Sequence, residues 1–101
     1  ANMVREGWEA LPQMLASLGP YLAHIHVKDV AITTDATVRD ARRADFPFMP
    51  LGQGVLDWPG IVKALRGIGY DGWYSVENFS GADVGISRLK QDRDWLAGLF
   101  A

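Results

Sequence analysis

The fold is decided by one short stretch, Ala23-His24-Ile25-His26-Val27-Lys28-Asp29. Side chains on a β-strand alternate between its faces, so His24, His26 and Lys28 are expected to project to one side. Ile25 and Val27 then project to the other. A strand with two imidazoles and an ammonium on one face is expected to turn that face toward water or a metal ion. The same spacing also suits a half-buried edge strand whose histidines are only solvated or hydrogen-bonded.

The size and composition of the chain describe one ordinary globular unit. Its 101 residues make a single domain at most, and 49% hydrophobic against 22% charged residues argue against a disordered chain. A net charge of −2 without a dense basic cluster argues against nucleic acid as a partner. The lack of cysteine excludes thiolate metal ligands and fits a cytoplasmic location. Residues 10–27 lack Asp, Glu, Lys and Arg but carry Pro, Gly and His, so no membrane span is expected.

Three helices are predicted around the histidine strand. The first covers about Gly7–Leu18 and ends at Gly19-Pro20. The second starts at an N-cap, Asp57, has Pro59 in its first turn and ends at Gly69; the third covers about Asp83–Phe100. Their predicted buried faces are Trp8, Leu11, Met14, Leu15 and Leu18 in the first helix, Ile61, Leu65 and Ile68 in the second, and Ile86, Leu89, Arg93, Leu96 and Phe100, widened by Trp95 and Leu99, in the third.

A second strand is predicted at Trp73–Glu77. Alternation places Glu77 at its carboxyl end, on the face of Ser75 and Trp73. Between the two strands, residues 30–50 form a polar loop that suits either substrate contacts or a surface excursion. The end of this loop, Phe46–Pro50, carries two prolines, so it is expected to be extended without being a central strand.

Helix, strand, helix, strand, helix is typical of parallel β/α units. Two strands and three helices do not close a barrel, so strand edges that favour association are expected. The chain is then either part of a larger barrel or completed by further copies of itself. Sites in such folds form at the carboxyl ends of the strands. There we expect His26, Lys28 and Asp29 to meet Glu77 and Asn78.

Several spaced motifs make the chain resemble one known family over almost its whole length. It resembles the C-terminal part of the xylose isomerase-like TIM-barrel superfamily, the sugar phosphate isomerase/epimerase group. The motifs are His24-Ile25-His26-Val27-Lys28-Asp29, Pro50-Leu51-Gly52-Gln53-Gly54-Val55-Leu56-Asp57-Trp58, Gly69-Tyr70-Asp71-Gly72-Trp73-Tyr74-Ser75-Val76-Glu77, and Leu89, Asp92 and Leu96 of the last helix. The resemblance implies an α/β fold in which residues 1–101 are a partial (β/α)8 barrel, roughly helix 6, strand 7, helix 7, strand 8 and helix 8.

The resemblance also implies a divalent-metal site built from two carboxylates of earlier strands, a histidine and a final glutamate. Carried over by position, His26 is the imidazole ligand, and Glu77 is both the last carboxylate ligand and the base that moves a proton. His24 and Lys28 line the site and bind substrate. The implied ion is Mn²⁺, Co²⁺, Mg²⁺ or Zn²⁺, because nitrogen and oxygen ligands alone are compatible with all four. The reaction implied is isomerisation or epimerisation of a sugar or polyol derivative through an enediolate.

The two earlier carboxylates are not found among the 101 residues, since Glu6, Glu9 and Asp29 do not lie where they would substitute. A barrel of this kind runs to about 250 residues. We therefore expect the site to be inactive unless a missing N-terminal barrel portion, or a homo-oligomer, completes it. Two alternatives remain open. One is a non-catalytic, self-associating β/α fragment. The other, disfavoured by two histidines and an acidic balance, is a relative of abasic-site endonucleases.

Overall fold

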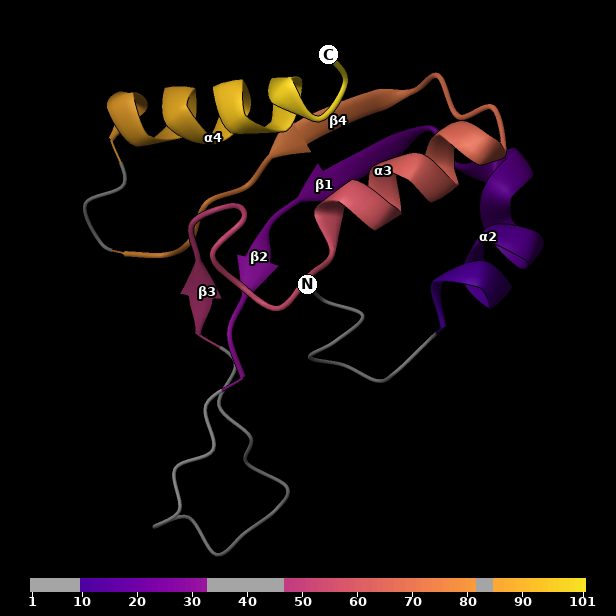
Figure 1. Ribbon diagram of the computed structural model, residues 1–101, viewed down its shortest axis with the longest axis horizontal. Coiled ribbons are helices and arrows are strands. Elements are labelled where there is room, and N and C mark those ends of the chain that lie inside the picture. Colours follow the sequence, from indigo (N-terminus) through magenta and orange to yellow (C-terminus); the bar gives the residue numbers. More distant parts are fainter. Residues whose placement is uncertain (1–9, 33–46, 82–84) are drawn as a thin grey trace, which may run out of the picture.

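Figure 1 shows the computed structural model, which describes residues 10–32, 47–81 and 85–101. The elements in chain order are α2 (Leu11–Leu18), the 3-10 helix η1 (Gly19–Tyr21), β1 (His24–Val27), β2 (Asp29–Val30), β3 (Phe48–Met49), α3 (Trp58–Gly67), β4 (Trp73–Val76) and α4 (Ile86–Gly98). The expected alternation of helices and strands is confirmed. Among the described ranges, no helix has the length and apolar character needed to cross a membrane.

The two predicted strands pair directly and in parallel, with His24 opposite Trp73 and Val27 opposite Val76. The predicted extended stretch before Pro50 is also found, as the two-residue strand β3. It pairs antiparallel with β2, which continues the chain just beyond β1. Most of the polar loop predicted between the two main strands lies outside the described residues.

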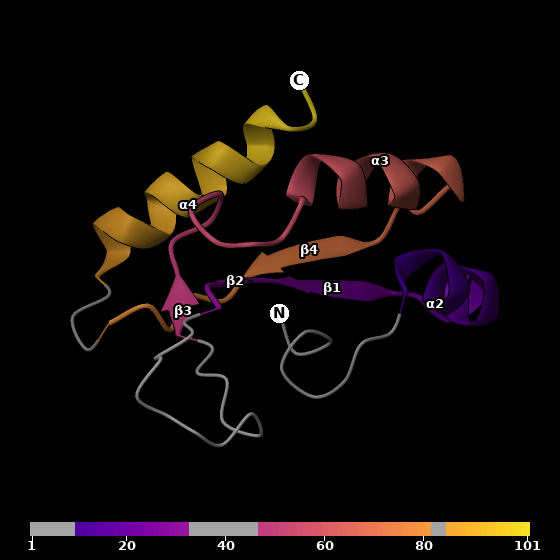
Figure 2. The same ribbon diagram turned by 60° about the horizontal axis from the view of Figure 1, so that its bottom comes forward.

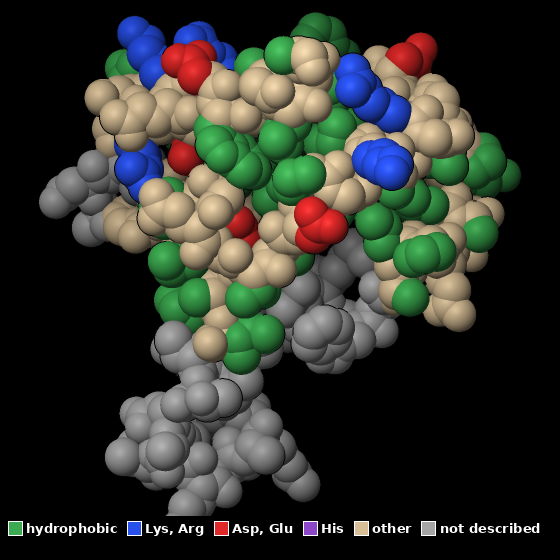
Figure 3. All heavy atoms as spheres, in the orientation of Figure 1, with side chains coloured by type: hydrophobic (Ala, Val, Ile, Leu, Met, Phe, Trp, Pro, Cys, Tyr) green, Lys and Arg blue, Asp and Glu red, His purple; other side chains and the backbone are tan. Residues whose placement is uncertain are grey.

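The hydrophobic core lies on one face of the β1–β4 sheet. Ile25 and Val27 from β1 and Tyr74 and Val76 from β4 pack there against side chains of α3 and α4. Figure 2 shows both helices on the same side of the two strands. Figure 3 looks onto this helical face, and no histidine side chain is visible on it. The alternation predicted for β1 is therefore confirmed: the apolar residues face the helices and the imidazoles face away.

Helix α3 starts and stops where the sequence predicted. The Asp57 side chain accepts a hydrogen bond from the Gly60 N–H at 3.1 Å, as an N-cap does. At the other end Gly69 has φ +73°, and its N–H and that of the next residue donate back to the last turn. One buried position was predicted wrongly: Ile68 is 45% exposed, because the helix ends at Gly67. The buried side chains are Trp58, Val62 and Leu65.

Helix α4 turns a different face inward than the hydrophobic pattern predicted. Ile86 is 73% exposed, and Leu89 and Arg93 are also exposed. The fully buried residues are Leu96 and, unexpectedly, the carboxylate residue Asp92. Trp95, Leu99 and Phe100 complete the packed side, as predicted. The predicted start at Asp83 lies outside the described residues, and the helix itself begins at Ile86 after an extended Gly85.

Helix α2 is shorter than predicted, since Ala10 is extended and the helix begins at Leu11. Pro12 lies in its first turn and it ends before Gly19, both as expected. Leu15 is buried, whereas Leu18 is 50% exposed. Trp8, Glu6 and Glu9 lie outside the described residues.

The end of α3 gives a test of the backbone assignment. An alanine at Gly69 meets no atom within 4 Å but must adopt a left-handed φ, so Gly69→Ala should destabilise the fold by about 1–2 kcal/mol. Gly67→Ala is the matched control, because its Cβ also meets no atom but its backbone is helical; it should stabilise by up to about 1 kcal/mol. Urea unfolding of both variants measures the difference. Equal effects of the two substitutions would contradict the assigned helix end.

Candidate functional site

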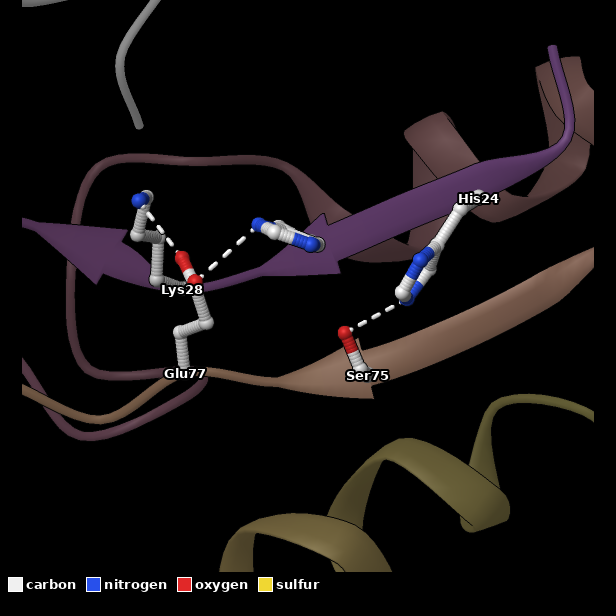
Figure 4. Close-up of polar contacts among 5 residues, drawn as sticks. His24, Lys28, Ser75 and Glu77 are labelled. Atoms are coloured by element: carbon white, nitrogen blue, oxygen red, sulfur yellow. Dashed lines mark hydrogen bonds and ion pairs between the residues drawn. The ribbon is translucent and has the colours of Figure 1, made fainter.

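The carboxylate of Glu77 contacts the side chains of His26 and Lys28 at the carboxyl ends of β1 and β4 (Figure 4). Its Oε1 lies 3.0 Å from His26 Nδ1, and its Oε2 accepts a hydrogen bond from Lys28 Nζ at 2.7 Å. The Glu77 N–H donates to the Val27 carbonyl at 2.8 Å, which continues the parallel ladder one step past β4. Glu77 therefore has a fixed position between the two residues of β1 and its extension.

The second histidine lies next to this contact. His24 Nε2 is 2.7 Å from Ser75 Oγ on β4, and the His24 and His26 rings meet edge to face with centroids 4.8 Å apart. The structure thus brings together four of the residues that the sequence singled out: His24, His26, Lys28 and Glu77. Ser75, expected on the same face, is the partner of His24.

Lys28 is enclosed more than its neighbours. Its side chain is 12% exposed, compared with 52% for His26 and 27% for Glu77. The ammonium lies 5.5 Å from the ring centre of Phe79 and 6.0 Å from that of Phe48, and the two rings contact each other at 5.2 Å. Aromatic faces attract a cation at this range. Lys28 is therefore held by a carboxylate on one side and by two aromatic rings on another.

The charges around Glu77 favour its ionised form. The hydrogen bond from Lys28 is the main cause that lowers its pKa, burial is the second cause and opposes it, and the charge of Lys28 and the nearby His26 and His24 lower the pKa further. Glu77 is consequently a carboxylate across the neutral range. A carboxylate beside two imidazoles and an ammonium is suited to hold a cation or to accept a proton.

Asp29 does not join this cluster, contrary to the expectation that it would. It is fully buried on the opposite side, and its carboxylate accepts backbone N–H donors of Val30, Gly52, Gly54 and Leu56 at 2.9–3.3 Å. Strand alternation carries the signal, because Asp29 shares the parity of Ile25 and Val27, which face the core. Its neighbour Lys28 has the parity of the histidines.

Asn78 also turns away from the site. Its side-chain amide donates to the buried carboxylate of Asp92 on α4, and its carbonyl oxygen accepts from the Ser80 N–H at 2.9 Å. The Asp92 carboxylate also accepts from the Leu51 N–H at 3.3 Å. The sequence did not predict that Asp92 is buried, because Asp92 is not among the residues expected on the buried face of α4.

Within the parts of the chain that are described, no group of three or more His, Asp or Glu side chains is arranged to hold a metal ion. His26 Nδ1 and Glu77 Oε1, one nitrogen and one oxygen atom, contact each other at 3.0 Å. Any complete metal site would therefore need donors beyond the described residues.

The chain belongs to the xylose isomerase-like TIM barrel family, whose model matches residues 1–99. The resemblance recognised in its motifs is confirmed. Of the curated proteins, inosose dehydratase of Geobacillus thermodenitrificans is 34% identical over 62 residues, which cover 55% of this chain and 21% of that protein. Inosose dehydratase of Erwinia tasmaniensis is 39% identical over 74 residues, 63% of this chain and 24% of that protein.

A third relative, inosose dehydratase of Yersinia enterocolitica, is 34% identical over 76 residues, which cover 68% of this chain and 25% of that protein. The chain thus spans at most about a quarter of the length of these curated relatives. No solved structure matches it significantly.

The Lys28–Glu77 contact makes a prediction about pH. Lys28→Met removes the hydrogen bond that lowers the pKa of Glu77, so this pKa should rise toward its ordinary value of 4.5. Because the folded-state pKa is the lower one, the pair stabilises the fold above pH 4.5, and this stability is lost as pH falls through the lowered pKa. The stability gap between wild type and variant should close over that acid range.

Carbon-13 NMR titration of the Glu77 carboxyl, together with urea unfolding at several pH values, measures both effects. Arg93→Met is the matched control, since it removes a cation that pairs with Asp94 on the exposed side of α4. An unchanged Glu77 titration in Lys28→Met would show that the ammonium does not control this carboxylate.

Proposed function

We propose that residues 1–101 form the last part of a (β/α)8 barrel, with β1 as strand 7 and β4 as strand 8. The parallel pairing of β1 and β4 supports this, as does the packing of α3 and α4 on one face of the sheet. That face is the outer face of the proposed barrel, and the face of His24, His26 and Ser75 is the inner one. The much greater length of the relatives is consistent with further strands.

The uncovered inner face also carries Trp73, which is 79% exposed. In the proposed barrel the N-terminal strands cover this face and supply the remaining metal ligands. The self-associating fragment predicted as an alternative would instead cover it with a second copy. Sedimentation of the complete gene product separates the two, because a barrel needs no second copy to bury Trp73.

We propose further that the completed site removes a proton from the carbon next to the carbonyl of a polyhydroxy ketone. This step is common to isomerisation, epimerisation and the loss of a neighbouring hydroxyl as water. The name shared by the three relatives, inosose dehydratase, favours loss of water from an inosose, a cyclic polyhydroxy ketone. The isomerase or epimerase outcome predicted from the sequence shares this first step but then returns a proton to carbon, whereas dehydration breaks the neighbouring C–O bond and the hydroxyl leaves with a proton as water.

The contact that carries the proposal is the position of Glu77 between His26 and Lys28. Its two oxygens have different partners, since Oε1 faces His26 and Oε2 faces Lys28. The two oxygens can therefore have different roles in the reaction. On the Oε1 side, His26 and Glu77 would hold a divalent ion. Their donor atoms are 3.0 Å apart, the spacing of adjacent ligands that lie about 2.1 Å from an octahedral cation.

Such an ion, when bound, would polarise the substrate carbonyl and make the adjacent C–H more acidic. The Glu77 carboxylate accepts the proton, which its lowered pKa permits by keeping it ionised. Lys28 has three N–H donors and gives one to Glu77, so it can also bind a substrate oxygen. His24, fixed by Ser75, binds a second substrate hydroxyl deeper on the inner face.

The first test follows proton removal directly. The complete gene product is incubated with an inosose and Mn²⁺ in D₂O; proton exchange is followed by NMR and loss of water by mass spectrometry. Glu77→Gln should lower both by about 10²–10⁴-fold, because a general base contributes that much. Asp57→Asn is the control, since Asn also caps helices and Asp57 lies outside the site. Full proton exchange in Glu77→Gln would exclude this residue as the base.

The second test concerns the ion alone. His26→Ala should weaken Mn²⁺ binding by at least about tenfold in calorimetry, since even indirect partners of metal ligands contribute that much. His24→Ala is the matched control, because it removes the same side chain two residues earlier on the same strand. If His26→Ala leaves the Mn²⁺ affinity unchanged, the assignment of this ligand is wrong.

A further inference from the structure

One loop donates hydrogen bonds to two buried carboxylates near the Glu77–Lys28 pair, those of Asp29 and Asp92. This loop, residues 51–56, runs from β3 toward α3. All of its backbone N–H groups have acceptors inside the protein. Those of Gly52, Gly54 and Leu56 donate to Asp29. That of Leu51 donates to Asp92. The remaining two donate to the carbonyls of Pro50 and Val30.

Two buried carboxylates therefore define the shape of this loop. Asp29 has no exposed surface and Asp92 is 3% exposed. A carboxylate has room for about four hydrogen bonds, and Asp29 uses that capacity entirely on backbone donors. Neither carboxylate has an oxygen directed at the candidate site. We call Asp29 and Asp92 the anchors, because their hydrogen bonds hold the backbone of loop 51–56 in place.

The anchors are attached to the site through the chain itself. Asp29 directly follows Lys28. Asn78, which donates to Asp92, directly follows Glu77. The residue after Lys28, Asp29, is therefore hydrogen-bonded directly to loop 51–56. The residue after Glu77, Asn78, is connected to the same loop through Asp92.

The packing around Asp29 and loop 51–56 is tight. A Cβ built on Gly54 would lie 2.1 Å from Asp29 Oδ1, and one built on Gly52 would lie 2.5 Å from the Trp95 ring. Backbone and side chains approach here as closely as glycine allows. The position of Asp29 is therefore set by the loop backbone and not by a flexible contact.

Lys28 needs such support because the parallel ladder does not reach it. The pairing of β1 with β4 ends at Val27, and the last ladder bond goes to the Val27 carbonyl. A lysine side chain has many rotamers, and holding it in one of them costs conformational entropy. A hydrogen bond of 2.7 Å to Glu77 persists only if the backbone that carries Lys28 is held in place.

We infer that Asp29 and Asp92 are positioning residues, which act through loop 51–56 to hold Lys28 against Glu77. The inference rests on the proposed function only for its effect on catalysis; the effect on geometry stands by itself. Asp29 fixes the Lys28 end and Asp92, through Asn78, fixes the Glu77 end. An error of about 1 Å in such a pair is enough to lower a rate by about 100-fold.

The test uses Asp29→Asn in the complete gene product. An amide directs an N–H₂ group at backbone N–H donors, so it breaks part of the anchor while it keeps the shape of the side chain. The first readout is spectroscopic: the Lys28 Hε protons lie beside the Phe79 and Phe48 rings and should show ring-current shifts. Asp29→Asn should reduce these shifts. Val62→Ala, a buried change in α3, controls for general loss of stability.

The second readout is kinetic. Asp29→Asn should lower kcat by about 10–100-fold with little change in KM, because alignment and not binding is lost. In a Lys28→Met background it should have almost no further effect, since two residues that act through one contact are not additive. Additive effects of the two substitutions, or full ring-current shifts in Asp29→Asn, would overturn the inference.

Asp92→Asn provides a second variant if Asp29→Asn does not fold. It should leave the Lys28 ring-current shifts nearly intact and reduce NMR contacts between Glu77 and Lys28, because it releases the other end of the pair. Unchanged contacts in a folded Asp92→Asn protein would also overturn the inference. If the wild-type protein lacks ketone-converting activity while Asp92→Asn still loses the NMR contacts between Glu77 and Lys28, positioning is supported and the proposed function is rejected.

Discussion

The contact of the Glu77 carboxylate with Lys28 and His26 is the interaction on which the functional part of this structure depends. It forms because two parallel strands end side by side and the ladder continues to the Glu77 N–H. Parallel pairing brings the carboxyl ends of both strands to the same edge. Residues some fifty positions apart in the chain therefore meet within hydrogen-bond distance. An antiparallel pairing of the same strands would have separated them.

The sequence predicted this contact because period-two alternation is strongly specified when one face of a strand is buried. A slip by one residue would have placed His26 in the core and Val27 in water. The end of α3 was also predictable, since Gly69 has a φ of +73°, which glycine adopts readily. The end of α2 was predicted at the right place too, although Gly19 itself keeps a helical backbone and begins the 3-10 helix η1. Family membership followed from the same motifs, which are the strands and turns that build the site.

What the sequence did not reveal is the role of its buried acids. Charge predicts exposure, so Asp92 had no place on the hydrophobic stripe of α4, whereas Ile86 and Leu89 were expected to be covered. In the structure both side chains are exposed. A buried carboxylate is stable only where several donors converge on it. That condition depends on the loop at residues 51–56, whose shape no periodicity describes.

The buried carboxylate of Asp29 and the site carboxylate of Glu77 have different surroundings, and this difference separates a structural role from a catalytic one. Asp29 is saturated by backbone donors in the interior, so it is committed to structure. Glu77 instead contacts the side chains of Lys28 and His26, and these side chains lower its pKa. In the proposed reaction Lys28 donates to Glu77 and to a substrate oxygen at the same time, so the carboxylate stays ionised until it accepts the proton. The Asp29 carboxylate is fully buried and occupied by backbone N–H donors, which is why Glu77 and not Asp29 suits the role of base.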